Sequence, residues 1–126
     1  MKFKFLTLAI VTIFIGCGSA SQNNSSNVVA DDYGYSEKNP VKVGGISNGP
    51  TNERNYLYRL TGINGEPVTF VRRGSCCHFE SKSATFGMGM LDVYEVKIKG
   101  DTIKKILYLN MYEKDKLYAP KGFLLK

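Results

Sequence analysis

The sequence of 126 residues is long enough for one small domain once a leader and a tether are set aside. Its composition, 43% hydrophobic and 22% charged, is that of a globular protein and excludes a fully disordered chain or a multi-pass membrane protein. The net charge of +6 comes from scattered basic residues. Nucleic-acid binders usually gather theirs on one face, so we expect no nucleic-acid partner.

Residues 1–16 have the pattern of a secretory signal peptide. Two lysines precede the charge-free run 5–15, which is shorter than the about 20 apolar residues that span a bilayer. Gly16 and Cys17 resemble the bacterial lipobox, in which a small residue precedes a Cys that receives a diacylglycerol. The resemblance implies cleavage before Cys17 and a membrane anchor of diacylglycerol and palmitate on this residue.

Residues 17–39 are predicted to be the lipidated Cys and a flexible tether. The stretch 19–27 is almost wholly Ser and Asn and has little apolar surface to bury. Pro40 marks the predicted boundary, so the domain is expected at 40–126. Surface-exposed Bacteroidetes lipoproteins tend to carry acidic residues after the lipidated Cys. The residues after Cys17 are neutral, which favours the outer membrane with the domain facing the periplasm.

One short helix is predicted in the first part of the domain. Thr51 or the residue after it can cap a helix that runs to about Leu60, and Gly62 is placed to end it. Tyr56, Leu57 and Leu60 would form its buried stripe, at spacings of three and four.

Alternating apolar residues predict strands at 68–73, 91–99 and 102–113. Gly100-Asp101 is a suitable two-residue hairpin turn between the last two. The nearly continuous apolar run at 106–109 predicts burial on both faces of the sheet. The stretch 117–125 closes the domain as a short edge strand or coil.

These elements predict an α+β fold. We expect a small antiparallel sheet of three to five strands with one short packing helix, preceded by the signal peptide and tether.

Cys76-Cys77-His78 is the one unusual cluster of reactive side chains. Three states fit the sequence: a vicinal disulfide, a buried pair of free thiols, or a redox or metal site. On a regular strand, Cys76 and His78 would share one face and Cys77 would point to the other. One face then offers two ligands, fewer than the four of a structural zinc site, so we predict neither a metal site nor catalytic residues here.

Three further positions are candidate sites. Met88 and Met90 lie in a Gly- and Met-rich stretch and, together with His78, are candidate ligand contacts, because thioethers repack easily. Thr102 lies in Asp101-Thr102-Ile103, which resembles the Asp-Ser/Thr-apolar O-glycosylation site of Bacteroidetes envelope proteins.

Seven segments of the domain carry a resemblance to a known family: NPVKVGG (39–45), NERNYL (52–57), LTGINGE (60–66), RGSCCHF (73–79), LDVYEV (91–96), LYLNMY (107–112) and APKGF (119–123). With these segments the domain resembles a family of small lipoproteins from Flavobacteria and their relatives that has no established activity. Some members carry the automatic label 2-dehydro-3-deoxyphosphooctonate aldolase. Enzymes of that name are cytoplasmic barrels, and an α/β barrel needs about 200 residues, so this activity is disfavoured.

The sequence therefore favours a cell-envelope lipoprotein that is a non-catalytic binding or structural module. Its expected partners are the membrane, through the anchor at Cys17, and an envelope protein or cell-wall glycan. No cofactor is expected. The alternatives are a thiol-based redox or metal site at Cys76-Cys77-His78, and an immunity-type lipoprotein that neutralises a secreted toxin.

Overall fold

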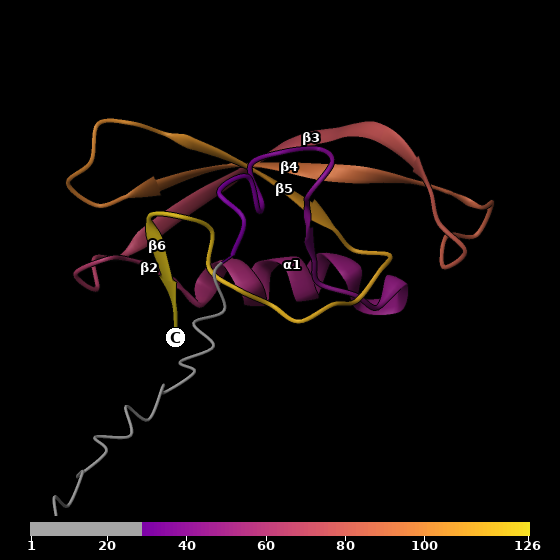
Figure 1. Ribbon diagram of the computed structural model, residues 1–126, viewed down its shortest axis with the longest axis horizontal. Helices are drawn as coiled ribbons and strands as arrows, with labels where there is room; N and C mark the ends of the chain where they lie inside the picture. Colours follow the sequence, from indigo (N-terminus) through magenta and orange to yellow (C-terminus); the bar gives the residue numbers. More distant parts are fainter. Residues whose placement is uncertain (1–28) are drawn as a thin grey trace, which may run out of the picture.

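A computed structural model of the chain describes residues 29–126, so the predicted signal peptide and Cys17 lie outside the described residues. A four-stranded sheet is covered on one side by α1, the one α-helix within residues 29–126 (Figure 1). The elements are β1 (Val41–Lys42), η1 (Ile46–Asn48), α1 (Gly49–Tyr58), β2 (Leu60–Gly62), β3 (Val68–Glu80), β4 (Met88–Ile98), β5 (Lys105–Asn110) and β6 (Phe123–Leu125).

The predicted α+β class is confirmed, and the main sheet is mixed. Its strand order is β1-β5-β4-β3, with β1 parallel to β5 and the other pairs antiparallel. β2 and β6 form a separate antiparallel pair, so the predicted closing strand is present only at its end. Among the described residues, no helix is long and apolar enough to cross a membrane.

Helix α1 has Asn48 as its N-cap, three residues before Thr51, the earlier of the two predicted caps, and ends at Tyr58. Pro50 lies in its first turn, where its missing N–H costs nothing. Gly62 does not end the helix as predicted, because it belongs to β2 and pairs with Phe123. The core lies between α1 and the sheet and consists of Val41, Val43, Tyr56, Leu57, Leu60, Tyr94, Val96, Leu107, Leu109 and Phe123.

The long hairpin of β3 and β4 dominates the sheet. β3 continues seven residues beyond its predicted end at Arg73 and contains both cysteines. The register of β4 against β5 pairs Val96 with Lys105, which centres the connection on Gly100-Asp101. The predicted two-residue turn is wrong, because β4 ends at Ile98 and β5 begins at Lys105, and residues 99–104 form a longer loop. The prediction that β5 is buried on both faces is wrong, because Ile106 is 39% exposed on the face away from α1.

The folded part begins before the predicted boundary at Pro40. Residues 29–39, assigned to the tether from their composition, pack against the domain. The Tyr108 amide donates to the Gly34 carbonyl at 2.8 Å, and the rings of Tyr33 and Tyr35 contact the core. Two tyrosines and one glycine, Tyr33, Tyr35 and Gly34, give this stretch the apolar surface and the turn that its charges did not suggest.

Candidate functional site

Cys76 and Cys77 form a vicinal disulfide in β3, one of the three states that the sequence left open. Two β-bulges interrupt the pairing of β3 with β4 here, and the second places Cys77 as the extra residue between Cys76 and His78. The φ of Cys77 is +63°, in the left-handed region that residues with a Cβ rarely adopt. The chain therefore holds an unfavourable backbone conformation at the disulfide.

The bulge separates Cys76 from His78, and the prediction that they share a face is wrong. Cys76 pairs with Leu91 and His78 with Met90, and neighbouring residues of β4 point to opposite faces. Because one extra residue shifts the alternation by one, Cys76 lies on the face away from α1 and His78 on the face towards it. The three side chains do not form a common site.

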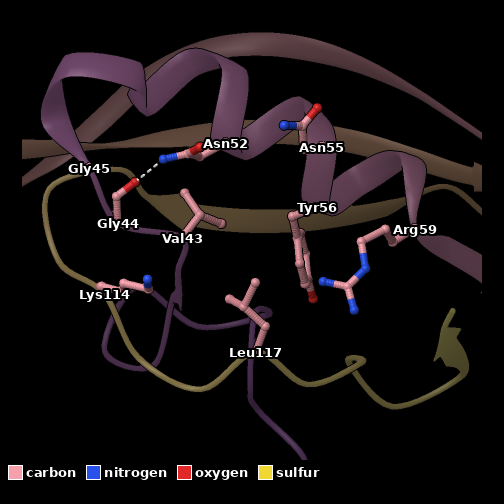
Figure 2. A pocket seen from close by; sticks show the side chains of 9 residues that line it. All are labelled: Val43, Gly44, Gly45, Asn52, Asn55, Tyr56, Arg59, Lys114 and Leu117. Atoms are coloured by element: carbon pink, nitrogen blue, oxygen red, sulfur yellow. Dashed lines mark hydrogen bonds between the residues drawn. The ribbon is translucent and has the colours of Figure 1, made fainter.

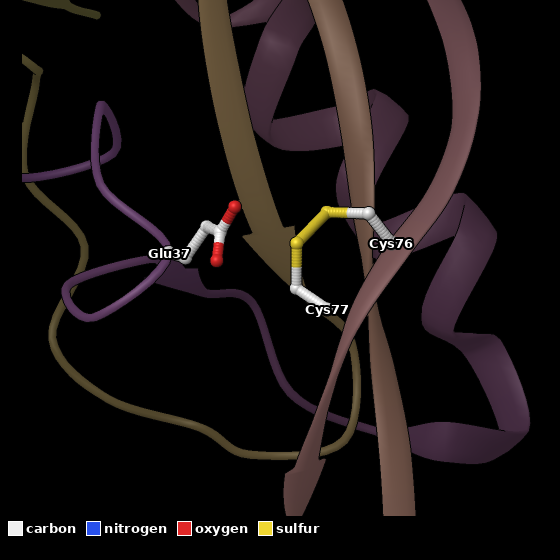
Figure 3. Close-up of side chains that lie close together, drawn as sticks. All are labelled: Glu37, Cys76 and Cys77. Atoms are coloured by element: carbon white, nitrogen blue, oxygen red, sulfur yellow. A yellow bond between two sulfur atoms is a disulfide. The ribbon is translucent and has the colours of Figure 1, made fainter.

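The structure places a third side chain, that of Glu37, beside the disulfide. Its segment passes on the side of the sheet away from α1, and one carboxylate oxygen lies within 4.8 Å of both sulfurs (Figure 3). Glu37 is exposed and both cysteines are half-buried. Sequence reasoning missed Glu37 because it lies in the segment interpreted as a tether.

The remaining predicted site residues are dispersed. Met88 is 49% exposed, whereas Met90 lines a cavity beside α1. Thr102 is exposed in the loop between β4 and β5, where Asp101 Oδ1 accepts the Ile103 amide at 3.0 Å. Thr102 is thus accessible, as an O-glycosylation site must be, and the modification stays a prediction.

The face of the sheet towards α1 carries a buried carboxyl pair that the sequence analysis did not identify. Glu53 of α1 is 0% exposed and Asp92 of β4 is 5% exposed. Tyr94 donates its hydroxyl to Glu53 Oε2 at 2.9 Å. Arg72 and Ser75 both donate to Asp92 Oδ1 at 2.8 Å. The available signal was a charged residue at position 53, three and four residues before Tyr56 and Leu57 on the buried stripe of the helix.

The two carboxyl groups hold different protonation states. Burial, together with the neighbouring Asp92 carboxylate, raises the pKa of Glu53 to about 8. Burial alone would raise the pKa of Asp92, but hydrogen bonds from Arg72, Glu53 and Ser75 lower it below its usual value. At neutral pH Glu53 is therefore protonated and Asp92 ionised.

This assignment also accounts for an unpaired oxygen of Glu53. Within residues 29–126, Glu53 Oε1 is the buried side-chain oxygen without a conventional hydrogen-bond partner. A proton on this carboxyl can be donated to Asp92, which lies in hydrogen-bond reach. The pair then shares one proton, and the charge of Asp92 is balanced by Arg72. We interpret it as a structural element.

An open cavity of about 250 Å³ lies along α1, between the helix and the loops at residues 43–45 and 114–117. Figure 2 shows Tyr56 projecting from α1 on the side of Leu117, with the guanidinium of Arg59, the residue after the helix, beside it. Asn52 Nδ2 donates to the Gly44 carbonyl at the other end of the cavity. None of its lining residues is acidic, and two, Arg59 and Lys114, are cationic.

No protein-family model, curated protein or solved structure matches the chain. The function therefore has to be inferred from the chemistry of these sites.

Proposed function

We propose that the protein is a cell-envelope lipoprotein, anchored through lipid on Cys17, whose domain is a non-catalytic binding module facing the periplasm. The anchor is supported by the signal-like residues 1–16 and by Gly16-Cys17. The binding role is supported by the cavity along α1. The fitting ligand is an anionic, hydroxyl-rich cell-wall glycan.

The choice of an anionic ligand rests on the charge of the cavity. Among the described residues, neither Arg59 nor Lys114 forms an ion pair with an acidic side chain. Arg59 Nε donates to the main-chain oxygen of Lys126 at 2.8 Å, so its other guanidinium nitrogens and the Lys114 ammonium are the groups that can bind carboxylates. The Asn55 amide and the amide oxygen of Asn52, whose nitrogen donates to Gly44, supply groups for hydroxyls. The apolar floor of Val43 and Leu117 would contact the less polar face of a sugar ring.

The anchor is tested by the intact mass of the protein extracted from its native membrane. We expect the mass of the chain from Cys17 plus acyl groups, and its loss in the Cys17→Ser variant. A processed chain without lipid, or an unprocessed chain in wild type, would contradict the anchor.

The binding role is tested by cosedimentation with purified peptidoglycan sacculi. We expect wild type to cosediment and the Arg59→Ala/Lys114→Ala variant to lose most of the binding. Lys97→Ala/Lys99→Ala is the matched control, since both of these lysines are exposed and lie outside the cavity. Equal behaviour of both double variants would reject the cavity as the glycan site.

A thiol-disulfide role is the second candidate function, and the disulfide at Cys76 and Cys77 favours it. Its half-buried sulfurs lie beside an exposed carboxylate and are within reach of a reductant. We expect neither thiol to be alkylated in the native protein until a reductant is added, as judged by mass. Free alkylation of both would show that the envelope keeps the pair reduced.

A further inference from the structure

We propose that Cys76 and Cys77, once reduced, bind a thiophilic divalent cation of the zinc class together with Glu37. The disulfide is then the closed state of a redox-gated metal site. This inference rests on the second candidate function, reduction of the disulfide, and is independent of glycan binding.

The three ligand atoms are already gathered. Both sulfurs and one oxygen of Glu37 lie within 4.8 Å of one another (Figure 3). Bonds of about 2.3 Å to sulfur and about 2.1 Å to oxygen hold the ligands of a tetrahedral ion about 4 Å apart. Reduction allows the two bonded sulfurs to move apart towards this spacing, and the Glu37 oxygen, within 4.8 Å of both, already lies near it.

The position of Glu37 leaves its carboxylate uncommitted. In the part of the chain that the structure describes, Glu37 forms no ion pair. Its turn is nonetheless held in place, because the Gly34 amide donates to the Asn39 carbonyl at 2.8 Å and Asn39 Nδ2 donates to Asp32 at 2.9 Å. Glu37 is thus a free ligand on a positioned segment.

Metal binding at this site depends on the oxidation state of the two sulfurs. A disulfide has no thiolate to offer, whereas a thiolate is the strong ligand for soft and borderline cations. A dithiol reductant supplies two electrons and two protons, the S–S bond breaks to give two thiols, and the reductant becomes a disulfide. The cation then binds both sulfurs and releases their two protons.

Three protein ligands make the site open. Structural zinc sites use four protein ligands, whereas sites with three keep a position for water or another molecule. His78 cannot supply the fourth ligand, because its pairing with Met90 directs it to the opposite face of the sheet. The ion would therefore be exchangeable, which suits capture or transfer of metal under reducing conditions.

The experiment titrates metal into the Cys17→Ser variant of the full chain, in which Cys76 and Cys77 are the remaining cysteines, before and after reduction. The protein is reduced with a phosphine, freed of reductant without oxygen, and titrated with Cd²⁺ while thiolate-to-metal absorption is followed. Competition with a chromophoric indicator then gives the affinity for Zn²⁺. We expect one ion per chain in the reduced protein and none in the oxidised protein.

Variants separate the ligands. Cys76→Ser/Cys77→Ser should abolish binding, and Glu37→Gln should weaken it about tenfold or more while keeping the thiolate absorption. Glu80→Gln is the matched control, since Glu80 is also exposed and lies outside the three-ligand group. Circular dichroism checks that each variant and the reduced protein stay folded.

Failure of the metal site can be distinguished from failure of the thiol-disulfide function. A disulfide that resists reduction in the folded protein would overturn both this proposal and the thiol-disulfide function. A reduced protein that binds no ion would overturn the metal site alone. Equal affinities in Glu37→Gln and wild type would remove Glu37 from the site and reject the proposed ligand set.

Discussion

The polar groups on the two faces of the β3–β4 hairpin differ in burial and in whether they have partners inside the fold. Towards α1, Glu53 and Asp92 are buried and share a proton, and Arg72 balances the remaining charge. On the other face, the disulfide is half-buried and Glu37 is exposed without an ion-pair partner among the described residues. A polar group that is hydrogen-bonded or charge-balanced inside the protein contributes to the stability of the fold, whereas a polar group without such a partner can bind a ligand.

The largest expected effect is on the free energy of unfolding, and its test removes one carboxyl group from each face in turn. Glu53→Ala should lower the free energy of unfolding by about 3 kcal/mol, because it leaves a cavity and removes the partner of the Tyr94 hydroxyl. Glu37→Ala should change it by less than about 0.5 kcal/mol, as exposed substitutions usually do. Urea unfolding measures both, and similar losses would contradict the contrast.

The pH dependence of stability tests the shared proton. Because the pKa of Glu53 is about 8 in the folded protein and lower in the unfolded chain, the folded state holds a proton that the unfolded state has lost across pH 5–8. The contribution of Glu53 is therefore complete below the unfolded pKa and is lost as pH rises through the folded one, by about 1 kcal/mol per pH unit.

Glu53→Gln is the matched control, because its amide can donate to Asp92 and accept from Tyr94 but does not titrate. We expect urea midpoints of wild type to fall relative to this variant between pH 5 and pH 8. Parallel curves would mean that Glu53 is ionised in the folded protein.

A smaller effect is expected at the bulge. With the disulfide removed by Cys76→Ser, Cys77→Gly should be about 1 kcal/mol more stable than Cys77→Ser, because glycine adopts positive φ without a Cβ clash. With Cys77→Ser as the background, Cys76→Gly should instead be less stable than Cys76→Ser, because Cys76 pairs regularly with Leu91. Thermal unfolding of the three double variants, Cys76→Ser/Cys77→Gly, Cys76→Ser/Cys77→Ser and Cys76→Gly/Cys77→Ser, distinguishes backbone conformation from a general effect of glycine.

The smallest effect is expected from loss of the disulfide itself. A bond between neighbouring residues closes almost no loop, so it constrains the unfolded chain very little. We expect Cys76→Ser/Cys77→Ser to unfold within about 1 kcal/mol of wild type, and reductant to leave the wild-type midpoint nearly unchanged. Unfolding by reductant alone would assign the disulfide a stabilising role and weaken its interpretation as a gate.

Local patterns predicted the elements but not the sites. Alternation along β4 and the helical spacing of Tyr56 and Leu57 indicated buried faces correctly, since both depend on neighbours in the sequence. The bulge at Cys77 could not be predicted that way, because it depends on the partner strand. Its effect was to reverse the predicted relation between Cys76 and His78.

The candidate sites needed long-range packing. Glu37 meets the cysteines across about forty residues, from a segment whose charges and turn residues are typical of a linker. Glu53 and Asp92 were visible as acids among apolar neighbours, but their proximity depends on how α1 crosses the sheet. The cavity at Arg59 and Lys114 likewise joins a helix to the C-terminal loop.

The packing of residues 29–39 onto the sheet also sets the volume that an anchored domain can explore. A tether from Cys17 to Pro40 would extend to about 80 Å, whereas the stretch from Cys17 to Val29 reaches only about 40 Å. Halving the radius reduces the accessible volume about eightfold and raises the local concentration of the domain at the membrane in proportion. A lipoprotein held in this way would encounter only ligands close to the bilayer, whatever their concentration elsewhere in the envelope.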